Sequence, residues 1–328
     1  MRNIIFGKFK QQSNFFKKSK YQFSQIIMWS EMFKQNVYNI CWNLQHWPIF
    51  TMSKASQLGE TLKGRELNKG FGGKTSNACA QFAFLAKPEE KPSLLTVDWK
   101  DSDGQSILNH FESINIKKDC VIINEKQPTG LAICFVFDNG ESAIVIHPCS
   151  LTKEMVQQHD EAIKKSKIVV TNFEIPVDVA AETLKIAHEA GATTILTVAL
   201  ATSCDKIIFR NSTIVIANQN ETGALKTTVD ELHSLGVEAV IETLGGDGAN
   251  VYVKRKQKVH VSTTPVKAID TTGAGDSFLG SFAYFLSKGQ SYEEAVQKAC
   301  KIASLSVQKI GTQSSYAHRG DPEISSLF

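Results

Sequence analysis

The chain has 328 residues, of which 42% are hydrophobic and 21% charged, and its formal net charge is +3. These values are typical of a globular protein with one sizeable core and a smaller appendage, and they do not indicate nucleic acid as a partner. No apolar run approaches the roughly 20 residues that a membrane-spanning helix needs. The seven cysteines form no C-x-x-C pair. This spacing predicts buried thiols in a reducing, cytoplasmic compartment, with neither a disulfide framework nor a zinc site.

The N-terminal residues 1–36 differ in composition from the rest of the chain. They are rich in Lys, Phe, Ser and Gln and contain no acidic residue before Glu31. An organellar transit peptide, a disordered extension and a wrongly assigned start of the chain all explain this composition. We therefore expect an N-terminal extension, disordered or targeting, followed by a single domain at residues 37–328.

From Val37 onward the pattern alternates strands and helices. Expected strands are Val37–Trp42, a hairpin of residues 131–137 and 141–147 around Asp138-Asn139-Gly140, and then Ile168–Val170, Thr194–Leu200, Ile214–Ala217 and Ala239–Leu244. Expected helices are Asn77–Leu85, Val177–Ala190 and Asp230–Leu235. Strands separated by helices of this length predict an α/β fold with a parallel sheet covered on both faces. In such folds, ligands bind beyond the carboxyl ends of the strands.

A glycine-rich stretch precedes the first expected helix. It does not fit the P-loop pattern G-x-x-x-x-G-K-[ST], because Asn68 stands where the first glycine is required. Gly72 and Gly73 would instead let a ligand approach the backbone closely, and Asn77 offers a donor and an acceptor to a hydroxyl group.

Three polar features follow expected strands. Glu174 comes after the strand at 168–170, Asn218 and Glu221 form N-x-x-E after the strand at 214–217, and residues 243–248 read T-L-G-G-D-G. Alone, each has an ordinary explanation as a solvated carboxylate or a turn. A carboxylate and an amide at a loop edge are nevertheless sufficient for an outer-shell role at Mg²⁺, which keeps several of its waters.

The stretch Asp270–Phe278 reads D-T-T-G-A-G-D-S-F, and apolar residues at helical spacing follow it. A phosphate lodged against Gly273, Ala274 and Gly275 would meet the free N–H groups and partial positive charge of a helix start. Asp276 is suited to take a proton from a hydroxyl that attacks such a phosphate. An Asp at this position more often serves only as a cap or first-turn charge, so the neighbouring motifs decide between the two readings.

In this order, the motifs resemble those of the ribokinase/PfkB family of carbohydrate kinases. D-T-T-G-A-G-D-S-F matches the family's C-terminal signature, and G-E-T at residues 59–61 with G-G-K at residues 72–74 matches its sugar-binding half. The resemblance covers roughly residues 59–315. It implies a ribokinase-like α/β fold with a small β-sheet lid, built from strands around residues 49–71 and 129–148, which can pair across a homodimer.

The resemblance also implies a role for each motif residue. Asp276 would be the general base, and the anion hole would be Gly273, Ala274 and Gly275. The sugar would be bound by Gly73, Lys74, Asn77, Glu174 and Asp276. ATP would be bound by Asn218, Thr243, Gly245, Gly248 and Gly275. Glu221 would bind Mg²⁺ through water, and K⁺ would be enclosed, mostly by backbone carbonyls, at Asp270, Thr272, Ser306, Lys309, Gly311 and Ser315.

Four positions depart from the family pattern. Trp47 stands at or near the place of an Asp that binds sugar hydroxyls, and Thr75 replaces the third glycine of G-G-K-G. Thr197 replaces the Asn or Asp of a dipeptide that ends in Pro, and Cys300 stands where an Asn tends to face adenine. The phosphoryl-transfer parts are therefore complete, while parts of the acceptor pocket are altered.

We therefore expect an ATP-dependent carbohydrate kinase that uses Mg²⁺ and K⁺ and phosphorylates the primary hydroxyl of a sugar, with D-ribose as the leading acceptor. One alternative is a kinase of a ketose, a sugar acid or a nucleoside. The other is a nucleotide-binding pseudokinase with an eroded sugar site. The retained Asp276 argues against a pseudokinase, because a protein that only binds has no need for a base.

Overall fold

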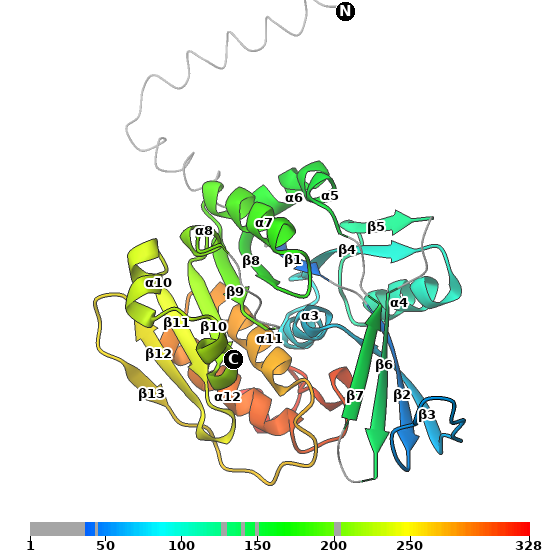
Figure 1. Cartoon of the computed structure of the whole chain (residues 1–328). Coiled ribbons are helices and arrows are strands. Elements are labelled where there is room, and N and C mark those ends of the chain that lie inside the picture. The colour runs from blue at the N-terminus through cyan, green and yellow to red at the C-terminus, as the bar shows by residue number, and fades with distance from the viewer. Residues whose placement is uncertain (1–36, 43–44, 126–129, 139–141, 148–150, 200–204) are drawn as a thin grey trace, which may run out of the picture. The chain divides into compact units, whose positions relative to one another are not determined.

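The computed structural model describes residues 37–42, 45–125, 130–138, 142–147, 151–199 and 205–328. Its larger sheet has nine strands in the order β13-β12-β11-β10-β9-β8-β1-β4-β5 (Figure 1). In chain order these strands are β1 (Val37–Trp42), β4 (Ser93–Trp99), β5 (Val121–Asn124), β8 (Ser166–Asn172), β9 (Thr193–Thr197), β10 (Ile214–Asn218), β11 (Ala239–Thr243), β12 (Ala249–Val253) and β13 (Val259–Val261). The strands from β5 to β11 pair in parallel, whereas β12 and β13 are antiparallel additions at one edge. The parallel α/β core predicted from the sequence is thus confirmed.

Both faces of this sheet are buried, because successive side chains of each strand enter different cores. In β8, Ile168 and Val170 join one hydrophobic cluster while Val169 joins the other. In β10, Ile216 joins the first of these clusters and Val215 joins the second. This period of two explains why the strands read as continuous apolar runs and not as alternating ones.

Helices cover each face. The first cluster is closed by α3 (Lys74–Leu85), α4 (Ser102–Ser113), α11 (Ala274–Ser287) and α12 (Tyr292–Ser306). The second is closed by α5 (Lys153–Gln158), α6 (Asp160–Lys164), α7 (Val177–Glu189), α8 (Ile207–Arg210) and α10 (Val229–Leu235). The short helix α9 (Gln219–Ala224) follows β10 directly.

A second, four-stranded sheet has the order β3-β2-β6-β7. Its strands are β2 (Gln45–Met52), β3 (Glu66–Gly72), β6 (Leu131–Phe137) and β7 (Ser142–His147). The predicted hairpin is confirmed, since β6 and β7 pair antiparallel from Leu131 opposite His147 to Val136 opposite Ser142. The chain between β2 and β3 is not strand, so the lid region expected at residues 49–71 consists of two strands joined by a long connection. The proposed division at residue 36 stays a prediction.

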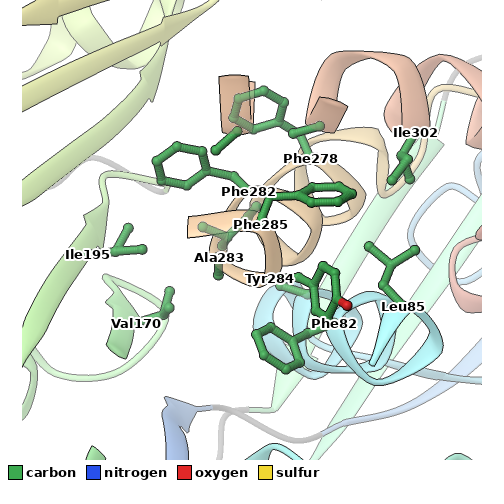
Figure 2. Packing of buried hydrophobic residues seen from close by; sticks show 14 of the residues in the cluster. Phe82, Leu85, Val170, Ile195, Phe278, Phe282, Ala283, Tyr284, Phe285 and Ile302 are labelled. Carbon is green, nitrogen blue, oxygen red and sulfur yellow. The ribbon is translucent and has the colours of Figure 1, made fainter. Parts of the chain in front are cut away.

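Helix α11, which follows the predicted phosphate turn, is largely buried. Its residues Ser277–Phe285 are all buried, and Phe282 and Phe285 pack in the first hydrophobic cluster (Figure 2). A side chain at Gly280 would run into the carbonyl oxygen of Ala78, so glycine allows α11 to lie directly against α3. This close approach places the beginnings of the two helices next to each other.

Two predicted boundaries were wrong by three residues, and β8 extends two residues beyond the predicted strand Ile168–Val170 at each end. Helix α3 begins at Lys74 and not at Asn77, because Gly73 takes up a φ of 97° that ends the strand and starts the helix immediately. Strand β9 ends at Thr197 and not at Leu200, although the amide of Val198 still donates to Ile216. The predicted buried thiols are confirmed for the four cysteines with described side chains, namely Cys79, Cys120, Cys134 and Cys300. In the part of the chain that the structure describes, no helix is long and apolar enough to cross a bilayer.

Candidate active site

The carboxyl ends of four neighbouring strands carry polar residues that lie side by side. Asn172 at the end of β8 is opposite Thr197 at the end of β9, and Asn218 at the end of β10 is opposite Thr243 at the end of β11. The starts of α3 and α11 adjoin this edge through the hydrogen bonds described below. Strand β1 lies between β8 and β4, so the strand order reverses there, which is where open α/β sheets bind ligands.

The glycine turn before α11 has the backbone that the sequence predicts. Gly273 has a φ of 75°, and a Cβ at this position would lie 2.7 Å from the hydroxyl oxygen of Tyr316. The Tyr316 hydroxyl donates a hydrogen bond of 2.9 Å to the Gly273 carbonyl, and this bond stabilises the turn. The amide of Ala274 closes the turn onto Thr271, whereas Gly275 is exposed and faces open space. The start of α11 therefore offers exposed backbone with partial positive charge, as an anion site requires.

Asp276 stands in the first turn of α11, but it does not cap the helix. Its Oδ2 accepts a hydrogen bond of 2.9 Å from Nδ2 of Asn77 on α3. Burial raises the pKa of Asp276 to about 6, and the negative charge of Glu221 acts in the same direction, while Lys74 and the Asn77 donor act against them. A carboxylate with this pKa is ionised at neutral pH and is still basic enough to take a proton.

Glu174 is a second acid of altered pKa at this site. Its Oε2 accepts the backbone amide of Lys74 at 3.1 Å, and its own amide donates to Oδ1 of Asn172 at 2.6 Å. Burial and then the charge of Asp276 raise the pKa of Glu174 to about 7, against the opposing influence of Lys74. Glu174 thus links the end of β8 to the start of α3.

Two buried polar atoms beside these acids have no hydrogen-bond partner among the described residues. They are Oγ1 of Thr75, which follows Lys74 on α3, and Nδ2 of Asn172. Both residues are fully buried, with an exposed fraction of 0% for each. Since unpaired buried polar groups are costly, hydroxyl groups of a bound ligand are suitable partners for them.

The N-x-x-E motif forms a capping box at the start of α9. The amide of Glu221 donates to Oδ1 of Asn218 at 2.9 Å, and the amide of Asn218 donates to Oε2 of Glu221 at 2.9 Å. The motif therefore has a structural role of its own, and Glu221 retains one carboxylate oxygen outside this pair. In the described ranges, no three His, Cys, Asp or Glu residues are grouped to hold a metal. Mg²⁺ keeps several of its waters, so a single carboxylate such as Glu221 is chemically sufficient to hold it through water.

The T-L-G-x-x-G motif is a tight turn between β11 and β12. The amide of Leu244 donates to the Gly248 carbonyl at 2.8 Å, and the amide of Gly248 donates to the Gly245 carbonyl at 3.1 Å. Gly245 and Gly248 have φ angles of 58° and 91°. Because Thr243 lies opposite Asn218 in the sheet register, this turn and the α9 capping box lie at adjacent strand ends.

The segment expected to enclose K⁺ lies against the glycine turn. Asp270 bridges the two, since its Oδ1 accepts the amide of Thr272 at 2.9 Å and its Oδ2 accepts the amide of Gly311 at 2.8 Å. These hydrogen bonds hold the pKa of Asp270 below its usual value although burial opposes them. Ser306, Lys309 and Ser315 belong to the same C-terminal segment, in which the Ser306 and Thr312 carbonyls accept local bonds. A carboxylate among backbone carbonyls is a suitable donor set for a hard cation.

The altered positions fall in different places. The backbone of Trp47 pairs with Gly70 in the second sheet, but its side chain lies outside the described part of the structure. Cys300 is 6% exposed within the first hydrophobic cluster, and burial raises its thiol pKa to about 12. Sequence reasoning missed Tyr316, which donates to Gly273, and Gln313, which donates to Asn77. It also missed His110 on α4, which contacts Gln313. The tail motif G-T-Q-S-S contains Gln313, so the sequence offered a signal for one of these three residues.

Comparisons with known proteins show the family to which the chain belongs. Residues 49–319 match the model of the family described as "pfkB family carbohydrate kinase". The chain therefore belongs to the pfkB family and is a carbohydrate kinase.

Within that family, the chain is similar to proteins named ribokinase. It is 32% identical to ribokinase of Mus musculus, with 82% of this chain and 88% of the mouse protein covered, and 30% identical to ribokinase of Dictyostelium discoideum, with 83% and 94% covered. The crystal structure of ribokinase from Thermotoga maritima has a TM-score of 0.81 at 29% identity and covers 89% of this chain and 98% of its own. Ribokinase of Arabidopsis thaliana, described as complexed with ribose and ATP, shares the fold with a TM-score of 0.80 at 24% identity.

Proposed function

We propose that this protein is an ATP-dependent ribokinase, which transfers the γ-phosphoryl group of ATP to the primary hydroxyl of D-ribose. The observation that carries the proposal is the position of Asp276, which is bonded to Asn77 beside the exposed Gly275 turn. This arrangement sets one carboxylate of raised pKa next to a helix start suited to phosphate. The similarity to ribokinases of mouse and Dictyostelium over most of each chain supports ribose as the acceptor.

In the proposed reaction, Asp276 takes the proton of the primary hydroxyl while the hydroxyl oxygen attacks the γ-phosphorus. The new O–P bond forms as the bond between that phosphorus and the leaving oxygen of ADP breaks. The backbone of Gly273, Ala274 and Gly275 would stabilise the charge that develops on the transferred group.

The binding residues proposed for the two substrates lie on both sides of this turn. Gly73, Lys74, Asn77 and Glu174 would bind the sugar, whose hydroxyls would also satisfy the buried atoms of Thr75 and Asn172. ATP would be bound by Asn218, Thr243, Gly245, Gly248 and Gly275.

The proposed cations have separate places. Glu221 would bind Mg²⁺ through water, and the ion would neutralise phosphate charge when bound. Asp270, Thr272, Ser306, Lys309, Gly311 and Ser315 would enclose K⁺ behind the glycine turn. A homodimer paired through the lid sheets, a cytoplasmic location and a targeting role for residues 1–36 stay predictions.

The proposal is tested by measuring acceptor-dependent ADP formation by the full chain. Ribose is compared with a ketose, a sugar acid and a nucleoside, each with K⁺ and with tetramethylammonium in its place. We expect the highest kcat/KM with ribose and a rate that falls without K⁺. Turnover with another acceptor alone would overturn the choice of ribose, and ATP binding without any turnover would indicate a pseudokinase.

A further inference from the structure

A row of polar side chains leads from Asp276 into the protein. Nδ2 of Asn77 lies 2.9 Å from Oδ2 of Asp276, and Nε2 of Gln313 lies 3.1 Å from Oδ1 of Asn77. Nε2 of His110 then lies 2.7 Å from Oε1 of Gln313. These four residues come from α11, α3, the turn at Gln313–Ser315 and α4, so the row joins segments that are distant in the sequence.

Little water reaches the middle of this row. Asn77 is 2% exposed and Gln313 is 8% exposed. The ring of His110 stacks on the ring of Phe71 in β3, with 4.0 Å between centroids and 8° between planes. Because buried amides must find partners within the protein, the orientation of each group depends on the next one.

The direction of every hydrogen bond follows from the charge of Asp276. An ionised carboxylate only accepts, so Asn77 must turn its NH₂ group to Asp276 and its oxygen to Gln313. Gln313 must then donate its NH₂ group to Asn77, which leaves its oxygen facing Nε2 of His110. His110 must therefore carry a proton on Nε2, and a neutral imidazole can do so in one of its two tautomers.

We propose that Gln313 and His110 are positioning residues for the base, which orient Asn77 so that it donates to Oδ2 of Asp276. Oδ2 is then occupied by a donor, and Oδ1 is the oxygen that takes the proton of the acceptor hydroxyl. This inference rests on the proposed function, in which Asp276 is the base. The stacking of His110 on Phe71 also makes the second sheet a support of the row.

Other charged groups also act on the two ends of the row. Lys74 at the start of α3 stabilises the ionised form of Asp276, whereas Glu221 on α9 disfavours it. Glu174 after β8 is itself affected by the Asp276 charge, and so is the hydroxyl of Tyr316. At the other end, burial lowers the pKa of His110 and so favours the neutral imidazole, while the hydrogen bond to Gln313 acts against this. Substitutions within the row leave these groups in place, so that a change in Asp276 reports on the row.

The test uses two kinds of variant. One reverses the direction of the hydrogen bonds in the row, and the other removes one of these bonds. His110→Glu replaces a donor by an acceptor, so the amides of Gln313 and Asn77 turn round and Oδ2 of Asp276 loses its donor. Gln313→Leu removes the donor to Asn77 without adding charge. In His110→Glu we expect the pKa of Asp276 to rise by about one unit, as loss of a hydrogen bond to a charged group implies. In Gln313→Leu, Asn77 can still donate but is no longer held in that orientation, so we expect a smaller rise of about half a unit. His110→Gln can still donate and is expected to stay near the wild type. Gln105→Glu, an exposed change on the same helix, controls for added charge.

Two readouts separate this inference from the proposed function. The first is the pKa of Asp276 in the ligand-free full chain, from carbon-13 NMR of labelled carboxyl groups assigned with Asp276→Asn. The second is the acid limb of kcat/KM against pH, which should move upward with that pKa and lower activity at pH 5 about tenfold in His110→Glu and about threefold in Gln313→Leu.

An Asp276 pKa and an acid limb within about 0.2 unit of wild type in both variants would overturn the positioning role, whatever the acceptor proves to be. A shifted pKa in a protein that turns over no acceptor would support the row and contradict the kinase proposal. If His110→Glu does not fold, Gln313→Leu against His110→Gln decides the question.

Discussion

The glycine turn and the acceptor side of the site are stabilised in different ways. The turn is held by its own backbone and by short bonds, such as those from Tyr316 to Gly273 and from the Gly311 amide to Asp270. The acceptor side consists of side chains from α3 and the end of β8, and it contains buried polar atoms that have no partner among the described residues. The turn is thus held by hydrogen bonds within the protein, whereas the acceptor side has buried polar atoms that the proposed sugar would pair with. Substitutions on the two sides should therefore affect different kinetic parameters.

The largest effect should come from Asp276→Asn, which removes the base and keeps the shape of the side chain. We expect kcat to fall by about 10²–10⁴-fold, the usual loss for a general base, while ATP binding persists. Asp178→Asn is a matched control, since Asp178 is an exposed first-turn acid of α7. Wild-type kcat in Asp276→Asn would exclude this carboxylate as the base.

Gly273→Ala should lower kcat nearly as strongly as Asp276→Asn, because it disturbs the glycine turn. An added Cβ would meet Tyr316 at 2.7 Å and force a residue with a φ of 75° out of place. We expect kcat to fall about 10²–10³-fold, as when an anion-hole donor is lost. Gly289→Ala is the control, because Gly289 has a φ of 79° but nothing near its Cβ position. It should lose about 1–2 kcal/mol of unfolding free energy and keep its activity. Equal kinetics in the two variants would show that the space around Gly273 is unimportant.

Glu174→Gln should act on the acceptor and not on the nucleotide. The amide keeps an oxygen for the Lys74 amide but has no charge to offer a sugar hydroxyl. We expect the KM of the acceptor to rise about 10-fold and the KM of ATP to stay the same, because a hydrogen bond to a charged group is weakened. Glu182→Gln, a partly buried acid on α7 that accepts from Gln157, is the control. A rise in the KM of ATP alone would show that Glu174 acts on the nucleotide and not on the acceptor.

The smallest effect concerns the way in which the thermal stability of the protein depends on pH. The folded pKa values of Asp276 and Glu174, about 6 and about 7, lie above their unfolded values. The folded state therefore retains protons that the unfolded state releases, and stability falls as pH rises through this range. Asp276→Asn should raise the unfolding midpoint by about 2–4 °C at pH 8, and the gain should shrink toward pH 4. Thermal scans at both pH values check this, and a gain that grows on acidification would show the opposite sign.

The sequence was sufficient for features built from neighbouring residues. The parallel sheet, α11 and the glycine turn follow from strand periodicity and from D-T-T-G-A-G-D-S-F, because their geometry depends on local backbone preferences. The contacts of Asn77 with Asp276 and Gln313 join residues 199 and 236 positions apart in the chain. No local pattern encodes such pairs, so the structure was needed to find His110 and Gln313. The early start of α3 was missed because a glycine of positive φ shortened the loop.

The most direct test of the central claim is to identify the product that the full chain makes from ribose and ATP. Phosphorus-31 NMR of the reaction mixture distinguishes a sugar phosphate from free phosphate and reports which carbon carries the group. We predict ADP and a single new signal, coupled to the two protons on carbon 5 of ribose, and no such signal with Asp276→Asn over the same time. ADP accompanied only by inorganic phosphate, or a phosphate on another ribose carbon, would contradict the account.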